Sequence, residues 1–159
     1  MKTWSTFFLD GSFFGVPVAD VQEVVNHLPI TPVPGAAAAI AGLFSLRGEI
    51  LTAIELRACL GLPPRPPGQP PLNLVVQREG EAVSLLVDEI GDVVSLEDDL
   101  FELPPDTLRG DVRAFIAGAY KLEHRLLLVL ETGRILDAVG PPAPLPEGPP
   151  APLTRGVAS

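Results

Sequence analysis

The sequence predicts a mainly β protein whose two similar halves fold as small antiparallel barrels around a shared core. Three features predict this class: strand-like stretches that alternate apolar and polar residues, an internal repeat, and a proline-rich segment between the repeated halves. The chain has 159 residues, 47% of them hydrophobic, which is enough for one buried core. Each repeated unit is short, so we expect the two units to pack against each other.

The first half opens with a hairpin. Residues 6–9 and 13–18 are strand-like, and Asp10-Gly11 between them is a dipeptide that two-residue hairpin turns prefer. We expect a short helix to follow at residues 19–26.

An apolar run then leads to Arg47-Gly48, and an alternation typical of a strand begins at Glu49. Gly48 can adopt the left-handed conformation that ends a helix. We therefore expect a helix from residue 36 to about residue 46, which places Arg47 at a rigid corner between two buried elements. Another short helix is expected at residues 57–60.

The second half is predicted to consist mostly of strands. Residues 72–77 and 82–87 flank Glu79-Gly80, which favours a turn, and residues 125–130 form a further apolar strand.

The chain repeats itself at two offsets. Residues 9–25 align without a gap on residues 78–94, and residues 40–60 align in the same way on residues 116–136. Among the matches, Gly11 meets Gly80, Val24-Val25 meets Val93-Val94, and Ile40-Ala41-Gly42 meets Ile116-Ala117-Gly118. The two alignments keep their order on either side of the proline segment, which indicates two copies of one structural unit.

Proline marks the boundaries. Residues 63–71 hold six prolines in nine positions, and such a segment enters neither a helix interior nor a central strand. We expect a single domain over residues 1–139, with halves at about 5–62 and 72–138 joined by this connector. A linker is the favoured interpretation of the connector, and a proline motif for a partner's groove is the alternative. Residues 140–159 hold seven more prolines and are expected to be disordered.

Composition excludes several classes of function. The net charge of −9 argues against nucleic acid and against an anionic membrane surface, both of which select clustered Lys and Arg. Cys59 is the single cysteine, so no disulfide can form within the chain. No apolar run reaches the ~20 residues of a membrane helix, and the first residues lack the apolar region of a signal peptide. We expect a soluble, cytoplasmic protein with no membrane insertion.

No catalytic, cofactor-binding or metal-ligating constellation is predicted. The two histidines, His27 and His124, have no second ligand at metal-binding spacing, and no phosphate-binding loop or nucleophile motif occurs. The adjacent carboxylates Asp88-Glu89 and Asp98-Asp99 are not spaced across a pocket as acid–base pairs are. We therefore expect no enzyme activity and no cofactor.

An ordered set of motifs resembles the CheW domain, the family of chemotaxis coupling proteins. The resemblance covers about residues 5–138, and its motifs are Val21-Gln22-Glu23-Val24, Gly42 through Gly48, Glu55-Leu56-Arg57 and Val87-Asp88-Glu89-Ile90. The resemblance implies two SH3-like five-stranded barrels around a shared core. It also implies an adaptor that binds the cytoplasmic tip of a chemoreceptor and the regulatory domain of a CheA-type histidine kinase. By motif position, Val21, Glu23 and Arg47 carry the receptor contacts.

The chain departs from the family pattern at Ser45, Thr52, Glu55 and Ser84, where Asn, Pro, Asp and Gly are usual. These departures leave open a divergent CheW-like module that binds a receptor or another partner without coupling a kinase.

Arg47 has a structural and a functional interpretation. Its charge can satisfy helix carbonyls or pair with Glu23, or it can offer a guanidinium to a partner. In the second half, Glu123-His124 aligns with Arg47-Gly48. The repeat therefore predicts that the fold does not need an arginine at this corner, which favours the functional interpretation.

Overall fold

A computed structural model describes the chain except for residues 27, 79, 105, 109 and 140–159. The expectations for the tail, for His27 and for Glu79 therefore fall outside the described residues. Ten strands account for most of the regular structure: β1 (Lys2–Leu9), β2 (Ser12–Pro17), β3 (Val21–Val25), β4 (Ile40–Leu46), β5 (Glu49–Glu55), β6 (Leu72–Arg78), β7 (Glu81–Val87), β8 (Glu89–Leu96), β9 (Ile116–Lys121) and β10 (Leu126–Leu130). The helices are short: α1 (Leu56–Cys59), α2 (Gly110–Phe115), α3 (Thr132–Val139) and the 3₁₀ turns η1 (Val18–Asp20) and η2 (Asp98–Leu100).

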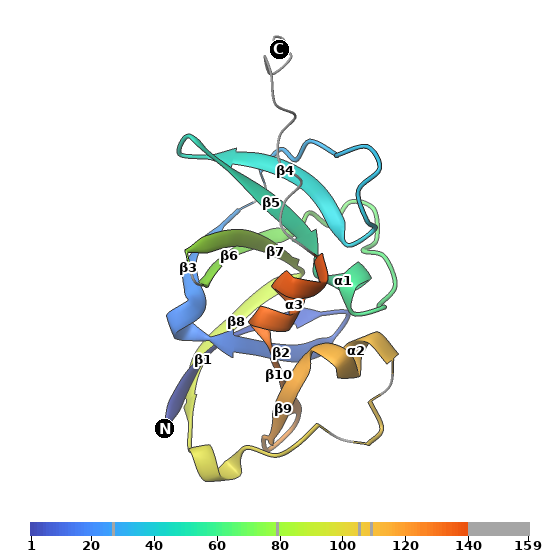
Figure 1. Cartoon of the computed structure of the whole chain (residues 1–159). Coiled ribbons are helices and arrows are strands. Elements are labelled where there is room, and N and C mark those ends of the chain that lie inside the picture. Colours follow the sequence, from blue (N-terminus) through green and yellow to red (C-terminus); the bar gives the residue numbers. More distant parts are fainter. Residues whose placement is uncertain (27, 79, 105, 109, 140–159) are drawn as a thin grey trace.

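The strands form two five-stranded sheets, which confirms the mainly β, two-barrel fold. The first sheet has the order β8-β1-β2-β10-β9, and the second has the order β3-β6-β7-β5-β4. Figure 1 shows the first barrel below the second, with the helices gathered near their junction. We call them the first and second barrels.

The repeat is visible in the strand order, but the barrels do not coincide with the two halves of the sequence. Replacing each strand by its repeat partner turns the order of the first sheet into that of the second. The first barrel combines the β1–β2 hairpin with β8, β9 and β10, whereas the second combines the β6–β7 hairpin with β3, β4 and β5. Each barrel therefore takes a hairpin from one half of the sequence and its other three strands from the other half.

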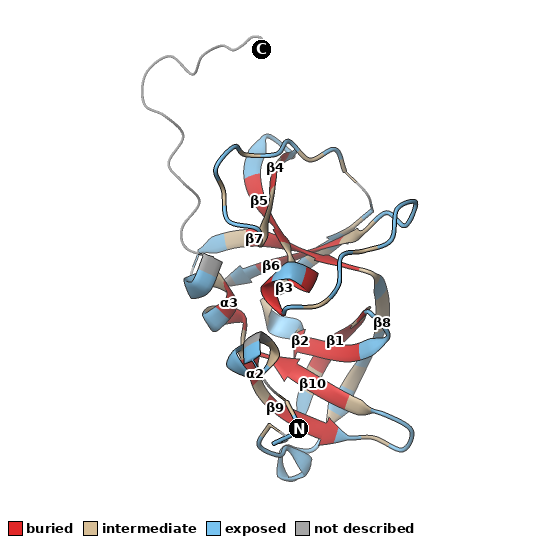
Figure 2. Ribbon diagram, turned by 90° about the vertical axis from the view of Figure 1, so that its right-hand side faces the viewer, coloured by how far each residue is buried: buried red, intermediate tan, exposed pale blue. Residues whose placement is uncertain are grey.

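Three apolar clusters form the core. One lies inside the first barrel around Trp4 and Tyr120, and another lies inside the second around Phe44 and Leu86. The largest lies between the barrels and takes residues from strands of both sheets and from the helices, including the fully buried Phe7 and Ile54. Figure 2 shows buried segments continuing from one barrel into the other. This central cluster is the shared core that the repeat predicted.

The first hairpin forms as predicted. β1 and β2 pair in antiparallel register around Asp10 and Gly11, whose φ angles are 50° and 81°. Two successive positive φ angles are typical of the type I′ turn, whose twist matches the strands on either side.

The predicted helix from residue 36 to about 46 is wrong, because Ile40–Leu46 is strand β4. β4 pairs with β5 through Arg47 and Gly48, which form a hairpin turn rather than a helix end. Gly42 has a φ of 152°, which an α-helix excludes, and its Cα lies so close to Thr31 that a Cβ would meet the Thr31 carbonyl oxygen at 2.3 Å. The apolar run contains no local signal for this pairing.

The predicted helix at residues 19–26 is also wrong. Only the single turn η1 forms, and β3 follows it as a strand rich in β-branched valine. The short helix expected at 57–60 is confirmed as α1, which begins one residue earlier. Among the described residues, no helix combines the length and the apolar character needed to cross a membrane.

Candidate functional site

The turn between β4 and β5 presents Arg47 to a carboxylate on β3. Arg47 Nη2 donates to Glu23 Oε1 at 2.7 Å, and Arg47 Nη1 donates to Glu23 Oε2, so the pair is bidentate. Arg47 has a φ of 51°, and the following Gly48 has a φ of 85°, which together turn the chain back within two residues. The side chain of Arg47 is 68% exposed, so its guanidinium remains accessible on the side away from Glu23.

Pairing shifts the pKa of each of the two groups in the direction that favours its charged form. The hydrogen bond from Arg47 lowers the pKa of Glu23, and the hydrogen bond to Glu23 raises the pKa of Arg47. Both groups are therefore ionised at neutral pH, and the arginine is held in one orientation by a fork of parallel hydrogen bonds. The alternative in which Arg47 satisfies helix carbonyls no longer applies, because β4 is a strand.

Of the three predicted site residues, the structure joins two. Val21 pairs with Val76 and packs against the core between the barrels. A register shift between Val21 and Glu23 separates it from the exposed pair. Val21 is thus a half-buried packing residue at the start of β3, whereas Glu23 and Arg47 form the surface feature.

A hollow of about 230 Å³ lies beside the Arg47–Glu23 pair at the mouth of the second barrel. Its lining combines apolar and polar side chains: Gln22, Leu46, Arg47, Glu49, Leu51, Gln77, Gly80 and Ala82. Ile50, in the same hairpin as Arg47, is an apolar side chain with 57% exposure. A charged group, a small hollow and an exposed apolar residue thus meet at one end of this barrel.

A second group of charges, which sequence reasoning missed, is buried at the joint between the barrels. The side chain of Arg57, at 5% exposure, donates from Nε to Asp88 Oδ1 at 3.1 Å and pairs with Asp88 through Nη2 as well. Arg57 Nη1 also donates to the Pro63 carbonyl at 2.9 Å. The backbone N–H of Asp10 donates to Asp88 Oδ2 at 2.8 Å. Arg57 and Asp88 belong to two motifs quoted above, but nothing in the sequence indicated that they pair.

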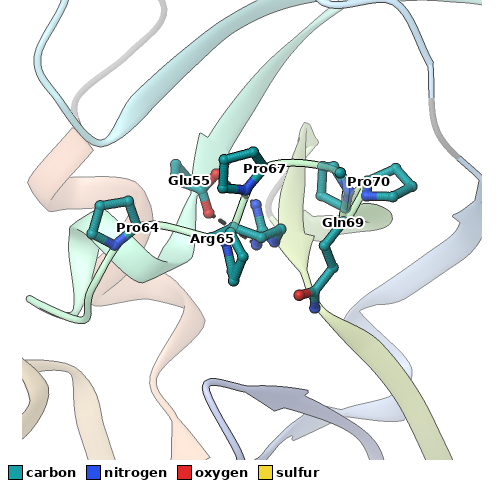
Figure 3. Close-up of a pocket in the computed structure, with 9 residues that line it drawn as sticks. Glu55, Pro64, Arg65, Pro67, Gln69 and Pro70 are labelled. Atoms are coloured by element: carbon teal, nitrogen blue, oxygen red, sulfur yellow. Dashed lines mark hydrogen bonds and ion pairs between the residues drawn. The ribbon is translucent and has the colours of Figure 1, made fainter.

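Arg65 ties the proline connector to the same group. Its Nε donates to Asp88 Oδ1 at 2.9 Å, and its two terminal nitrogens donate to Glu55 at 2.9 and 3.1 Å. Figure 3 shows Arg65 and Glu55 pointing toward each other, with the proline rings of the connector around them. A shallow hollow of about 570 Å³ runs along the connector. The segment is therefore an anchored strap, since its one arginine is held by two carboxylates.

The electrostatics of this group favour its charged state. Burial alone raises the pKa of Asp88, but hydrogen bonds from Arg57, the Asp10 N–H and Arg65 outweigh it and hold the pKa below its ordinary value. The hydrogen bond to Asp88 raises the pKa of Arg57. Asp88 is thus a structural ion-pair partner.

No group of three or more His, Cys, Asp or Glu side chains with metal-binding geometry is found within the part of the chain that the structure describes. Cys59 is buried within the central core.

The paired barrels and the exposed ion pair define a β-barrel module with a surface suited to contacts between proteins. The family model for the CheW-like domain matches residues 4–140, and the chain belongs to that family.

Similar proteins include the chemotaxis protein CheW of Rhizobium meliloti, 31% identical over 80% of each chain. The chemotaxis protein CheW of Bacillus subtilis is 26% identical over 89% of this chain and 90% of its own. Among solved structures, the scaffolding protein TtCheW from Thermoanaerobacter tengcongensis superposes with a TM-score of 0.74 at 28% identity. That match covers 82% of this chain and 88% of the other.

Proposed function

We propose that this protein is a chemotaxis adaptor that couples the cytoplasmic tip of a chemoreceptor to the regulatory domain of a CheA-type histidine kinase. Membership of the CheW-like family and similarity to proteins named as chemotaxis proteins support the class of function. The proposal includes a cytoplasmic location and a role in binding without a catalytic step.

We assign the receptor site to the exposed Arg47–Glu23 pair. Its carboxylate holds the guanidinium in place before a partner arrives, which lowers the entropy that binding would otherwise cost. Arg47 still offers donors to a partner's carboxylate or carbonyl groups. Val21 contributes through packing at the base of β3, so its expected effect on receptor binding is indirect.

Binding measurements with purified partners test the proposal. The full chain is titrated by calorimetry with a receptor-tip fragment and, separately, with the kinase regulatory domain from the same organism. A ternary complex on gel filtration, together with receptor-dependent kinase activity only when the adaptor is present, is the expected result. A folded chain that binds neither partner would refute the proposal. Binding to the receptor alone would favour the alternative module that does not couple a kinase.

A further inference from the structure

The two barrels can be compared position by position, because the repeat offsets hold throughout their pairing. Phe8 pairs with Phe13 in the first barrel, and the equivalent Gln77 pairs with Ala82 in the second. In the first barrel, Leu127 pairs in parallel with Phe13. The equivalent residues of the second barrel are Leu51 and Ala82, which lie opposite each other because the next pair along these strands is Thr52–Val83. Each barrel therefore has a corresponding corner at its mouth.

In the first barrel this corner is filled by aromatic and cationic side chains. The rings of Phe8 and Phe13 lie 5.0 Å apart, and the Arg125 guanidinium lies 4.3 Å from the centre of the Phe13 ring. Gly91 lies against both rings: a Cβ there would be in ordinary contact with each ring at 3.4 Å, but only 2.5 Å from Thr6 Oγ1. A cation on aromatic rings is a favourable arrangement, and here it is formed within one chain. We call this group the filled corner.

In the second barrel the equivalent positions hold Gln77, Ala82, Glu49 and Gln22. No aromatic ring and no cation stand at these four positions, and the hollow of about 230 Å³ lies there. We call this hollow the open corner. It is smaller than the roughly 300–1,000 Å³ of typical small-molecule pockets, so its size suits one or two side chains of a partner.

The charge of the open corner is opposite to that of the filled one. Glu49 stands where the first barrel has Arg125, and it is exposed, with no ion-pair partner among the described residues. The nearby charge of Arg47 is balanced by Glu23. Ala82 leaves empty the place that Phe13 occupies in the first barrel.

We propose that the open corner receives an aromatic side chain flanked by a lysine or arginine from the chemoreceptor tip. The aromatic ring lies over Ala82 where Phe13 lies in the first barrel, and the cation pairs with Glu49. The partner thereby supplies, across an interface, the aromatic and cationic side chains that the first barrel supplies from its own chain. This inference rests on the proposed function and specifies the chemistry that the receptor brings to the site beside Arg47.

Two substitutions test the inference in the full chain. Ala82→Phe fills the open corner from within, as Phe13 does in the first barrel, and Glu49→Arg reverses its charge. We expect each to weaken binding of the receptor-tip fragment at least about tenfold in calorimetry, with kinase-domain binding unchanged. The matched controls are Ala38→Phe on an exposed loop and Glu123→Arg on the first barrel, which should change receptor binding by less than about twofold.

Circular dichroism verifies that each variant is folded, and Glu49→Arg tests the site even if Ala82→Phe does not fold. If the folded variants bind the receptor tip as the wild type does, or lose kinase binding instead, the inference is wrong. If the wild type binds no receptor tip, the proposed function fails.

A separate measurement then tests the chemistry alone. N-acetyl-phenylalanyl-argininamide should shift the amide resonances of Glu49 and Ala82 in the labelled full chain more strongly than its glutamate counterpart. Equal shifts from the two peptides would overturn the inference.

Discussion

At the scale of single residues, two arginines that both pair with carboxylates differ in what surrounds them. Arg47 is largely exposed, and water solvates the pair that it forms with Glu23. Arg57 is buried, and its partner Asp88 is nearly inaccessible as well. Exposed ion pairs contribute little to stability, whereas a buried charge that loses its partner is strongly destabilising. The same type of contact therefore stabilises the fold at the buried site and contributes little to stability at the exposed site, where we propose that it serves binding.

Arg47→Ala should leave the fold intact and weaken receptor binding. The free energy of unfolding from urea denaturation should stay close to the wild-type value, because alanine adopts the same backbone conformation no worse than arginine does. The dissociation constant for the receptor tip should rise at least about tenfold. Large destabilisation with unchanged binding would show that Arg47 serves the fold.

Asp88→Asn should destabilise the protein by about 3–5 kcal/mol at pH 7, because Arg57 and Arg65 lose the charge they share. The pKa of Asp88 is lower in the folded state than in the unfolded state, so its contribution is complete above the unfolded value of about 3.9. That contribution is lost as the pH falls through the lower folded value. Urea denaturation between pH 7 and pH 2 should show the difference between wild type and variant shrinking in acid. A constant difference would contradict this assignment.

At the scale of elements, the proline connector is held in place by two arginines: Arg65 within it, and Arg57, which donates to the Pro63 carbonyl. Prolines restrict the backbone of residues 63–71, and Arg65 adds bonds to β5 and to the residue after β7. The strap thus connects both sides of the joint between the barrels.

The coupling between Arg65 and Glu55 can be measured by a double-mutant cycle. Arg65→Met and Glu55→Gln should each destabilise the chain, and their combination should show a coupling energy of about 0.5–3 kcal/mol. Hydrogen exchange in residues 63–71 should accelerate in Arg65→Met. Additive effects and unchanged exchange would mean that Arg65 does not hold the strap.

At the scale of the whole molecule, exchange of hairpins makes the two barrels interdependent. A fragment of residues 1–62 keeps β3, β4 and β5 but lacks the β6–β7 hairpin that completes their sheet. Its own β1–β2 hairpin has no β8 or β10 to pair with.

We therefore expect the fragments 1–62 and 72–139 to be unfolded separately and to form a folded complex when they are expressed together. Amide spectra by NMR of each fragment and of the mixture test this, with the intact chain as the reference. A dispersed, native-like spectrum from either fragment alone would show that a half folds independently.

Local signals in the sequence determined the first hairpin, the repeat and the family, because each depends on neighbouring residues or on ordered motifs. The pairing of Arg47 with Glu23 was among the predicted alternatives for the same reason: both residues lie in recognisable motifs. Tertiary structure alone decided that Ile40–Leu46 is a strand, since its apolar run is compatible with a helix until β5 pairs with it. It also decided the exchange of hairpins, the burial of Arg65 against Asp88 and the open corner beside Arg47. These features arise from contacts between residues far apart in the chain, whose energies no local pattern contains.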